Sequence, residues 1–389
     1  MMRLFLVAGE TSGDRHAAAL VRELHRLEPS LACTGLGGPQ MGAAGVELVA
    51  DLTQHAVVGI VEVLRHLGTL RRLFRQAVDA LDAQRPDAVV LVDYPGFNLR
   101  FAREAKRRGI PVIYYVSPQI WAWGAGRLRT IRRLVDRMLV FFSFEESLYA
   151  DAGIPVTWVG HPLLDAAPAA QPRAQVLQQY GLRSDQPVVA LLPGSRVQEI
   201  QRLLPILAGA AERLGGQLRG VRFLVLQAPG VDAALYRTAI RAEHGRGTNA
   251  ALTLVPEWDN HLLAACDLAL VASGTATLQC ALLNLPMVIV YRTNPITWWI
   301  GKRLVRLPYI GLVNVVAGRR LVPECLQGGA TPAAIADAAL GILRSDAVRR
   351  QMQAGFQTVR ASLGHPGASR RAAEAVLTTM AGRSSGRSR

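Results

Sequence analysis

Short apolar runs, many of them rich in β-branched residues, alternate along the chain with longer segments of helical periodicity. In the first half the expected strands are Arg3–Ala8, Leu31–Thr34, Ala88–Val92, Val112–Val116 and Met138–Phe142, and the expected helices are about Asp14–Leu27 and Arg100–Arg108. The strand segments are apolar on both faces, as in a parallel sheet that helices cover on each side. The pattern therefore predicts a doubly wound α/β domain.

The alternation is interrupted at Ala166–Pro172, where two prolines and several small residues break helical periodicity and mark a linker. It then resumes, and the expected strands are Val188–Leu192, Arg222–Leu226, Leu252–Val255, Leu268–Ala272 and Met287–Tyr291. This repetition predicts two Rossmann-like domains that face each other across a cleft. We expect residues 1–165 and 166–366 to form these domains, and residues 367–389 to add a helix at about Ala368–Met380 and a basic, disordered tail.

Composition excludes a small binding module and a disordered chain, because half of the 389 residues are hydrophobic and only 19% are charged. The formal net charge is +15, and Lys106 and Lys302 are the only lysines, so nearly all of the positive charge is arginine. An arginine excess fits phosphorylated ligands, anionic lipid or nucleic acid, but it fits a general compositional bias equally well. For most individual arginines we favour the compositional explanation.

The four cysteines show neither a C-x-x-C pair nor a metal-ligand spacing with histidine, so we expect no disulfide framework and no zinc site. A reducing cytoplasm fits this pattern. The N-terminal apolar run ends at Gly9-Glu10, too early for a signal peptide. Leu268–Tyr291 contains no charged residue, but Pro286 and several polar residues interrupt it, which favours strand, helix and strand over a membrane span.

Ligands collect at the carboxyl ends of the strands in an open parallel sheet, so the residues directly after each strand are candidates for a site. After the first strand, Gly9–Asp14 forms a glycine-punctuated turn into a helix, whose free N–H groups suit an anion or a sugar hydroxyl. A loop in which Ser12 or Asp14 only caps the helix explains the segment equally well. Asp93, directly after Ala88–Val92, is placed to accept a proton from a substrate hydroxyl, or else to satisfy turn amides.

Ser117 follows the next strand and precedes Trp121, Trp123 and an arginine-rich segment at residues 127–137. Aromatic faces can support a sugar ring or an acyl chain, and arginines can hold phosphate. Packing of the tryptophans in a core or an interface is an equal explanation.

Two loops of the second half have the composition of anion sites. The residues concerned are Gly194, Ser195, Arg196, Ser273, Gly274, Thr275 and Gln279. The first loop combines backbone amides with a guanidinium into a diphosphate cradle, and the second leaves room for phosphates at a helix N-terminus, with Gln279 within reach of ribose hydroxyls. A structural turn explains each loop separately, but two such loops in one domain favour nucleotide binding.

Several common motifs are absent. Gly35–Gln40 resembles a dinucleotide fingerprint, but Gln40 takes the place of the third glycine and Pro39 disrupts the helix start, which disfavours a nicotinamide dehydrogenase. The P-loop spacing, H-E-x-x-H and G-x-S-x-G do not occur either, so P-loop, zinc-hydrolase and serine-hydrolase chemistry lack support.

A series of short motifs runs through the chain in a fixed order. They are Ala8–Asp14, Gly59–Leu64, Asp93 with Pro95 and Phe97-Asn98, Tyr115–Pro118 with Trp121–Trp123, Val159–Pro162, Leu192–Arg196, Ala272–Ala276, Tyr291-Arg292, Asn314 and Ala317–Arg319. Each motif is weak alone, but their order and spacing resemble the lipid-A-disaccharide synthase family from the first strand to about Gln327.

The resemblance implies a GT-B glycosyltransferase that joins UDP-2,3-diacylglucosamine to 2,3-diacylglucosamine 1-phosphate (lipid X), releases UDP and inverts the anomeric centre. It implies Asp93 as the catalytic base, Glu10 and Asp14 as further catalytic candidates, and Arg196 at the diphosphate. The other implied substrate-binding residues are Gly9, Ser12, Asn98, Ser117, Gly194, Ser195, Ser273, Gly274, Thr275, Gln279, Arg292 and Asn314. Neither a metal nor another cofactor is expected.

Two positions depart from the family pattern. Many relatives carry glutamate where Gln279 stands, and a neutral amide accepts ribose hydrogen bonds less strongly than a carboxylate does. We expect weaker donor binding, or a neighbouring acid that substitutes. Some relatives have aspartate where Gly96 stands, so the base is assigned to Asp93 alone.

Acylated substrates require an apolar surface. Val57–Phe74 mixes apolar residues with arginines and predicts a basic amphipathic helix at an anionic membrane surface, and Trp298–Arg306 is a second candidate. An ordinary helix packed on its sheet explains either segment too. We expect a cytoplasmic enzyme attached peripherally to the inner face of the cytoplasmic membrane, and the resemblance adds a homodimer as a candidate assembly.

Two alternatives remain beside this interpretation. Another GT-B enzyme that uses UDP-N-acetylglucosamine, such as a peptidoglycan transferase or a 2-epimerase, follows the same fold logic. A nucleic-acid-binding protein is suggested by charge alone, but the arginines are not interleaved with exposed aromatic residues in a recognised module. Nucleic acid is therefore not expected as a partner.

Overall fold

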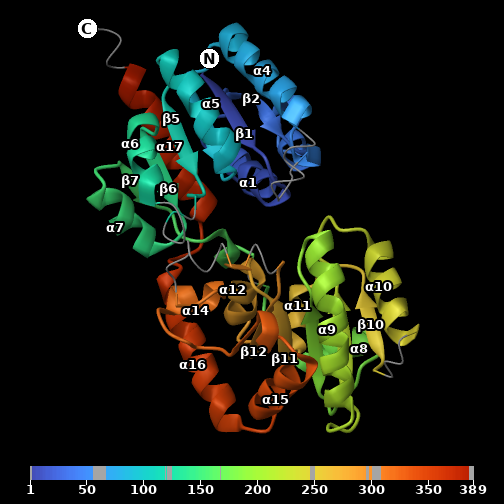
Figure 1. Ribbon diagram of the computed structural model, residues 1–389. Helices are drawn as coiled ribbons and strands as arrows, with labels where there is room; N and C mark the ends of the chain where they lie inside the picture. The colour runs from blue at the N-terminus through green and yellow to red at the C-terminus, as the bar shows by residue number, and fades with distance from the viewer. Residues whose placement is uncertain are drawn as a thin grey trace. The chain divides into compact units, whose positions relative to one another are not determined.

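The computed structural model describes residues 2–55, 67–118, 120, 125–166, 168–245, 250–294, 298–299 and 308–384. The chain forms two compact units, of which the first comprises Met1–Asp165 with Leu363–Arg389 and the second comprises Ala166–Ser362 (Figure 1). The first boundary falls in the expected linker. The C-terminal residues, by contrast, belong to the first unit, so the division differs from the three consecutive segments expected from the sequence.

The first unit is built on a seven-stranded parallel sheet of order β3-β2-β1-β4-β5-β6-β7. Its strands are β1 (Arg3–Ala8), β2 (Ala32–Gly37), β3 (Glu47–Asp51), β4 (Ala88–Val92), β5 (Val112–Tyr115), β6 (Arg137–Val140) and β7 (Val156–Trp158). Its helices are α1 (Thr11–Leu27), α2 (Pro39–Ala43), α4 (Leu67–Gln84), α5 (Pro95–Arg107), α6 (Leu128–Leu134), α7 (Ser143–Asp151) and α17 (Ala368–Ser384).

The second unit repeats this plan on a six-stranded parallel sheet of order β10-β9-β8-β11-β12-β13. Its strands are β8 (Val188–Leu192), β9 (Arg222–Leu226), β10 (Leu252–Val255), β11 (Leu268–Ala272), β12 (Met287–Tyr291) and β13 (Glu324–Leu326). Its helices are α8 (Arg173–Gln179), α9 (Val197–Gly215), α10 (Ala233–Gly245), α11 (Asn260–Ala265), α12 (Thr275–Leu282), α14 (Leu312–Ala317), α15 (Pro332–Leu343) and α16 (Asp346–Ser362). The predicted doubly wound α/β class is confirmed in both units.

The apolar pattern located the central strands well, and the five strands expected in the second half coincide with β8 to β12. It missed β3, β7 and β13, which lie at sheet edges and are only partly buried. An edge strand packs on fewer neighbours, so it lacks the two-sided apolar signature that reveals a central strand. Leu268–Tyr291 forms β11, α12 and β12, as the sequence predicts, and no helix of the described ranges is long and apolar enough to cross a membrane.

Aromatic packing joins α4 and α5 to one face of the first sheet. The ring of Phe74 contacts the rings of Phe97 and Phe101, and Leu73 is 4% exposed in the same core. The C-terminal part of the expected membrane-surface segment therefore packs on its own sheet, because its apolar residues recur on the buried side of α4. Residues 56–66 of that segment lie outside the described ranges.

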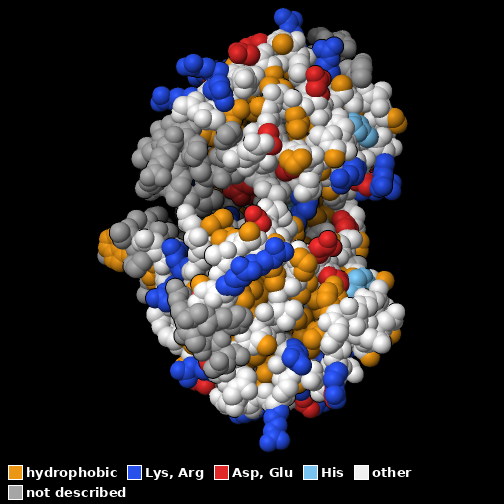
Figure 2. All heavy atoms as spheres, turned by 90° about the vertical axis from the view of Figure 1, so that its right-hand side faces the viewer, with side chains coloured by type: hydrophobic (Ala, Val, Ile, Leu, Met, Phe, Trp, Pro, Cys, Tyr) orange, Lys and Arg blue, Asp and Glu red, His pale blue; other side chains and the backbone are white. Residues whose placement is uncertain are grey.

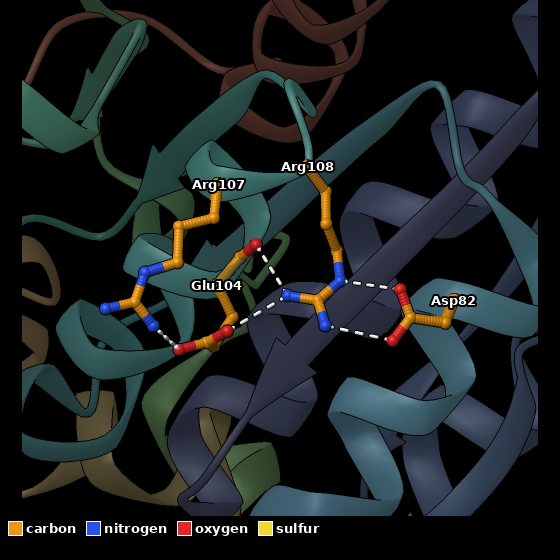
Figure 3. Close-up of polar contacts among 4 residues, drawn as sticks. All are labelled: Asp82, Glu104, Arg107 and Arg108. Atoms are coloured by element: carbon orange, nitrogen blue, oxygen red, sulfur yellow. Dashed lines mark hydrogen bonds and ion pairs between the residues drawn. The ribbon is translucent and has the colours of Figure 1, made fainter.

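At the surface, Arg108 links α4 and α5 through ion pairs and hydrogen bonds (Figure 3). Its guanidinium makes a bidentate contact with Asp82 of α4, at 2.7 and 2.9 Å, and donates to the carbonyl and the carboxylate of Glu104 of α5, both at 3.0 Å. Hydrogen bonding to Arg108 lowers the pKa of Asp82, although this carboxylate is exposed to solvent. The fork geometry of arginine lets one side chain hold both helices.

Helix α17 completes the other face of the first unit by packing on α1 (Figure 1). Ala372, Ala373, Val376 and Met380 are buried there. The helix extends to Ser384 instead of ending near Met380, so the first residues of the tail that was expected to be disordered are helical. Residues 385–389 lie outside the described ranges.

Arg371 of α17 is expected to contribute to stability, because its guanidinium donates to the carbonyls of Val159, His365 and Pro366 at 2.6–2.9 Å. Replacing it by glutamine should lower the free energy of unfolding by about 1–3 kcal/mol, as hydrogen bonds from a charged donor are lost. Arg370→Gln is the matched control, since Arg370 forms a surface ion pair with exposed Glu374 and its loss should change stability by less than about 0.5 kcal/mol. Equal midpoints of urea unfolding for the two variants would contradict this role.

Candidate active site

The order of neighbouring strands reverses between β1 and β4 in the first sheet, where Ala8 pairs with Val92. The loops after these two strands therefore diverge and leave room for a ligand at the carboxyl edge. Gly9 lies against the ring of Tyr94, since a Cβ atom at position 9 would be 2.2 Å from a ring carbon. Burial raises the pKa of Tyr94, and the charge of Glu10 raises it further. Gly9, Glu10 and the turn at Asp93 thus share one edge of the sheet.

The turn at Asp93 has an unusual backbone. Asp93 and Tyr94 adopt φ angles of 48° and 45°, the left-handed region that residues with a Cβ seldom occupy. The carbonyl of Asp93 accepts hydrogen bonds from Asn98 Nδ2 at 2.7 Å and from the Tyr114 hydroxyl at 2.6 Å. Asn98 is fully buried and faces the backbone of this turn, which is a different place from the substrate contact expected of it.

Asp14 is also engaged with the backbone. Its buried carboxylate accepts hydrogen bonds from the N–H groups of Gly38, Gln40 and Met41 at 2.9–3.0 Å, and so caps the N-terminus of α2. This contact explains why a polar residue in the first turn of α1 is buried. Ser12, two residues earlier, is exposed.

Ser117 lies at the end of β5 but faces the interior. Its hydroxyl donates to Glu145 Oε1 at 2.6 Å, while Glu145 Oε2 accepts from the Phe142 N–H at 3.2 Å. Ser117 and Glu145 are 7% and 3% exposed, so the serine serves a buried polar network at the start of α7. Trp121 and Trp123 lie outside the described residues.

Two histidines flank Phe141 beyond the end of β6. The ring of Phe141 lies 5.2 Å from that of His16 and 5.1 Å from that of His161. Burial lowers the pKa of His161 to about 3, with a smaller contribution from His16, and burial lowers the pKa of His16 to about 4. His161 is therefore neutral, and its Nδ1 accepts the Leu163 N–H at 3.1 Å. Nothing in the sequence pattern around His16 indicated this cluster.

The buried state of His161 should make the first unit acid-sensitive. Between pH 7 and 5 an unfolded histidine takes up a proton near pH 6.5, whereas folded His161 does not, so the free energy of unfolding falls as the pH is lowered. His161→Asn should reduce this loss by roughly 1–2 kcal/mol at pH 5, while keeping an acceptor for Leu163.

Urea unfolding at pH 7.5 and pH 5.0 measures this difference, and His365→Asn, at an exposed position, is the control. An unchanged pH dependence in His161→Asn would show that another group takes up the protons.

The second sheet reverses its order between β8 and β11. After β8, Gly194 adopts a φ of 116°, and the Ser195 N–H donates to Glu199 Oε2 at 3.1 Å. The Arg196 guanidinium contacts Glu199 Oε1 at 3.2 Å and is 52% exposed. The Ser195 N–H and the Arg196 guanidinium, which are the two expected diphosphate donors, thus both contact the carboxylate of Glu199.

After β11, Gly274 and Thr275 are exposed at the N-terminus of α12, whereas the hydroxyl of Ser273 donates to the carbonyl of Ile310 at 2.9 Å. The free amides of α12 therefore lie at the same carboxyl edge as the loop after β8. Arg292, which follows β12, is exposed too.

Gln279 is oriented by its neighbours. Asn260 Oδ1 accepts hydrogen bonds from Trp258 Nε1 at 2.9 Å and from Gln279 Nε2 at 2.5 Å. An indole N–H can only donate, so the oxygen of Asn260 must face it, and Gln279 must turn its NH₂ group to that oxygen. The carbonyl oxygen of Gln279 consequently points away from Asn260 as an acceptor.

Asn314 has a structural environment. Its Nδ2 donates to Val322 O and Glu324 Oε1, and its Oδ1 accepts from the Leu321 and Val322 N–H groups, all at 2.8–3.0 Å. The side chain is fully buried and holds the segment between α14 and β13. The expected substrate contact of Asn314 is therefore not what its side chain does in this structure.

Charge and metal-ligand patterns add little to the site. Figure 2 shows Lys and Arg side chains dispersed over the visible face with acidic side chains among them, without one continuous basic surface. No group of three or more His, Cys, Asp or Glu residues that could hold a metal ion occurs in the described ranges.

Two Rossmann-like units, each with its loops at the strand-order reversal, are the building plan of the GT-B fold, and comparison with known proteins supports this fold class. The UDP-N-acetylglucosamine 2-epimerase from Neisseria meningitidis matches 97% of the chain and 100% of its own at 12% identity, with a TM-score of 0.65. CalG4, the calicheamicin glycosyltransferase, matches 98% and 99% at 18% identity, with a TM-score of 0.62. These likenesses concern the fold.

The sequence profile of the lipid-A-disaccharide synthetase family matches residues 4–378. Lipid-A-disaccharide synthase from Myxococcus xanthus is 43% identical over 96% of this chain and 97% of its own, and that from Syntrophus aciditrophicus is 44% identical over the same shares. The chain belongs to this family of glycosyltransferases, and the epimerase and peptidoglycan alternatives are not favoured.

Proposed function

We propose that the chain condenses UDP-2,3-diacylglucosamine with 2,3-diacylglucosamine 1-phosphate, giving lipid A disaccharide 1-phosphate and UDP. The observation that carries this proposal is the family match over residues 4–378, in a chain whose two sheets each present the expected loops at the reversal of strand order. The first unit supplies the acceptor side and the base, and the second unit binds the UDP moiety.

The chemistry is a single displacement. Asp93 accepts the proton of the acceptor hydroxyl while the oxygen of that hydroxyl forms the new bond to the anomeric carbon. The bond from that carbon to the diphosphate breaks, and the configuration at the carbon is inverted. Charge that develops on the leaving UDP is stabilised by the Ser195 N–H and the Arg196 guanidinium. Glu10, at the same edge as Asp93, is the second candidate for the base, and Asp14 positions α2 instead of touching substrate.

In this proposal Glu199 is the internal hydrogen-bond acceptor for the groups that bind the diphosphate. Its carboxylate oxygens contact the Ser195 N–H and the Arg196 guanidinium at 3.1 and 3.2 Å. The diphosphate takes over these donors when UDP-sugar binds, and its two phosphates offer more acceptor oxygens than one carboxylate.

We also propose peripheral attachment to an anionic membrane surface, because both substrates carry acyl chains. The segments expected to make this contact lie largely in residues 56–66 and 300–307, outside the described ranges. Trp299 is described and is 56% exposed, which suits an interfacial anchor. A homodimer and a location at the inner face of the cytoplasmic membrane belong to the same proposal.

Donor choice tests the proposed function. Purified protein with lipid X is expected to release UDP from UDP-2,3-diacylglucosamine, whereas UDP-N-acetylglucosamine should support turnover at least about 100-fold more slowly, since its acyl-chain binding energy is missing. Product formation is followed by mass spectrometry, and equal turnover of both donors would overturn the lipid assignment.

Two variants should fail in different ways. Asp93→Ala is expected to lower kcat by about 10²–10⁴-fold with an unchanged Kd for UDP, because a base acts on the acceptor. Arg196→Ala should raise the Kd for UDP roughly tenfold or more, as charged hydrogen bonds to the diphosphate are lost.

Titration calorimetry with UDP separates the two effects, and Arg202→Ala, further along α9, is the control. Unchanged UDP affinity in Arg196→Ala would remove Arg196 from the diphosphate site.

A further inference from the structure

We propose that Tyr114 and Asn98 are positioning residues that set the direction of the Asp93 carboxylate by locking the backbone at its own carbonyl. This inference rests on the proposed function, since it presupposes that Asp93 is the base. Tyr114, which lies in an apolar strand, thereby gains a role in the reaction. Asn98, which was expected to contact the substrate, instead supports the base.

The backbone at Asp93 needs such support. Two consecutive residues with side chains, Asp93 and Tyr94, occupy the left-handed region at φ angles of 48° and 45°. Both conformations are unfavourable for residues with a Cβ atom, so the turn persists only if its surroundings hold it. The direction of the Asp93 side chain depends on the backbone conformation of the same residue. A change in the φ angle of Asp93 would therefore point the carboxylate in another direction.

Asn98 holds the turn from α5. Its Nδ2 donates to the carbonyls of Val92 at 3.1 Å and Asp93 at 2.7 Å, so one amide group bridges the last residue of β4 and the first residue of the turn. Its Oδ1 is buried without a hydrogen-bond partner in the described part of the chain. Leaving that oxygen unpaired costs free energy, which indicates that the amide is placed for its two donated bonds.

Tyr114 holds the same carbonyl from the neighbouring strand. In the sheet, Tyr114 of β5 pairs with Leu91 of β4. The Tyr114 hydroxyl extends beyond the end of β4 and donates a hydrogen bond to the carbonyl oxygen of Asp93 at 2.6 Å. Burial raises the pKa of Tyr114, with the charge of Asp93 as a smaller cause, so the hydroxyl stays protonated and remains a donor. The Asp93 carbonyl therefore receives two hydrogen bonds from buried, rigid groups.

A matched control lies one residue away. Tyr115 is equally buried, but successive residues of a strand point to opposite faces, and its hydroxyl makes no hydrogen bond to the described backbone of the Asp93 turn. Tyr114→Phe and Tyr115→Phe each remove one buried hydroxyl from β5. They differ in whether the Asp93 turn loses a hydrogen bond.

The experiment compares Tyr114→Phe, Tyr115→Phe and Asp93→Ala in the full chain, with kcat, the KM for lipid X, the Kd for UDP and the midpoint of urea unfolding measured for each. Tyr114→Phe is expected to lower kcat roughly 10- to 100-fold, because a small misplacement of a catalytic group has effects of this size. Its Kd for UDP should stay within twofold, and Tyr115→Phe should stay within twofold in kcat.

Asn98→Asp provides a second variant, because it keeps the shape of the side chain and replaces the two donated bonds by repulsion between oxygens. It should lower kcat by at least as much as Tyr114→Phe, again without a change in the Kd for UDP. In the Asp93→Ala background Tyr114→Phe should cause no further fall in kcat, since there is no carboxylate left to direct.

The outcomes separate this inference from the function on which it rests. If Asp93→Ala is inactive and Tyr114→Phe keeps kcat within twofold, the positioning role is overturned and the base survives. If Tyr114→Phe loses kcat only in proportion to a loss of folded protein, its role is structural and the inference is wrong. If Asp93→Ala retains turnover, the base assignment fails, and the positioning role fails with it.

Discussion

The active-site architecture depends on one constraint, which is that a parallel sheet can carry helices on both faces only if its winding reverses somewhere. In this chain the reversals fall between β1 and β4 and between β8 and β11. Strand pairing brings the ends of β1 and β4 together at Ala8 and Val92, so the loops that follow must separate to opposite faces. The space left between them is set by the topology, before any side chain is chosen.

At both reversals of strand order, the polar loop residues are fixed by hydrogen bonds or ion pairs to neighbouring residues. Asp93 is fixed through its carbonyl by Asn98 and Tyr114, and the loop at Arg196 is fixed by Glu199. In the proposed mechanism such contacts reduce the motion of the groups that would meet the substrate, and so lower the entropic cost of reaching the transition state. The loop in the first unit is thus held by buried neutral donors, and the loop in the second unit by a partly buried carboxylate.

The sequence predicted the central strands and the loops that carry the site, because buried strands and glycine-rich turns have strong local signatures. It could not separate polar residues that face a ligand from polar residues that hold the chain. Asp14, Ser117 and Asn314 have the residue types of a binding site, but α2, Glu145 and the segment before β13 occupy their hydrogen-bonding groups. The polar role of Tyr114 was not predicted for the opposite reason, since a tyrosine in an apolar strand is expected to be a core residue.

The position of α17 has a consequence for how the protein is made. The helix covers α1 of the first unit, but the ribosome synthesises it only after the whole of the second unit. The nascent N-terminal unit therefore emerges with the surface that α17 covers still exposed, and about half of the chain is synthesised before that helix follows. During that interval the second unit is synthesised, while the residues of the first unit that α17 buries stay exposed to solvent.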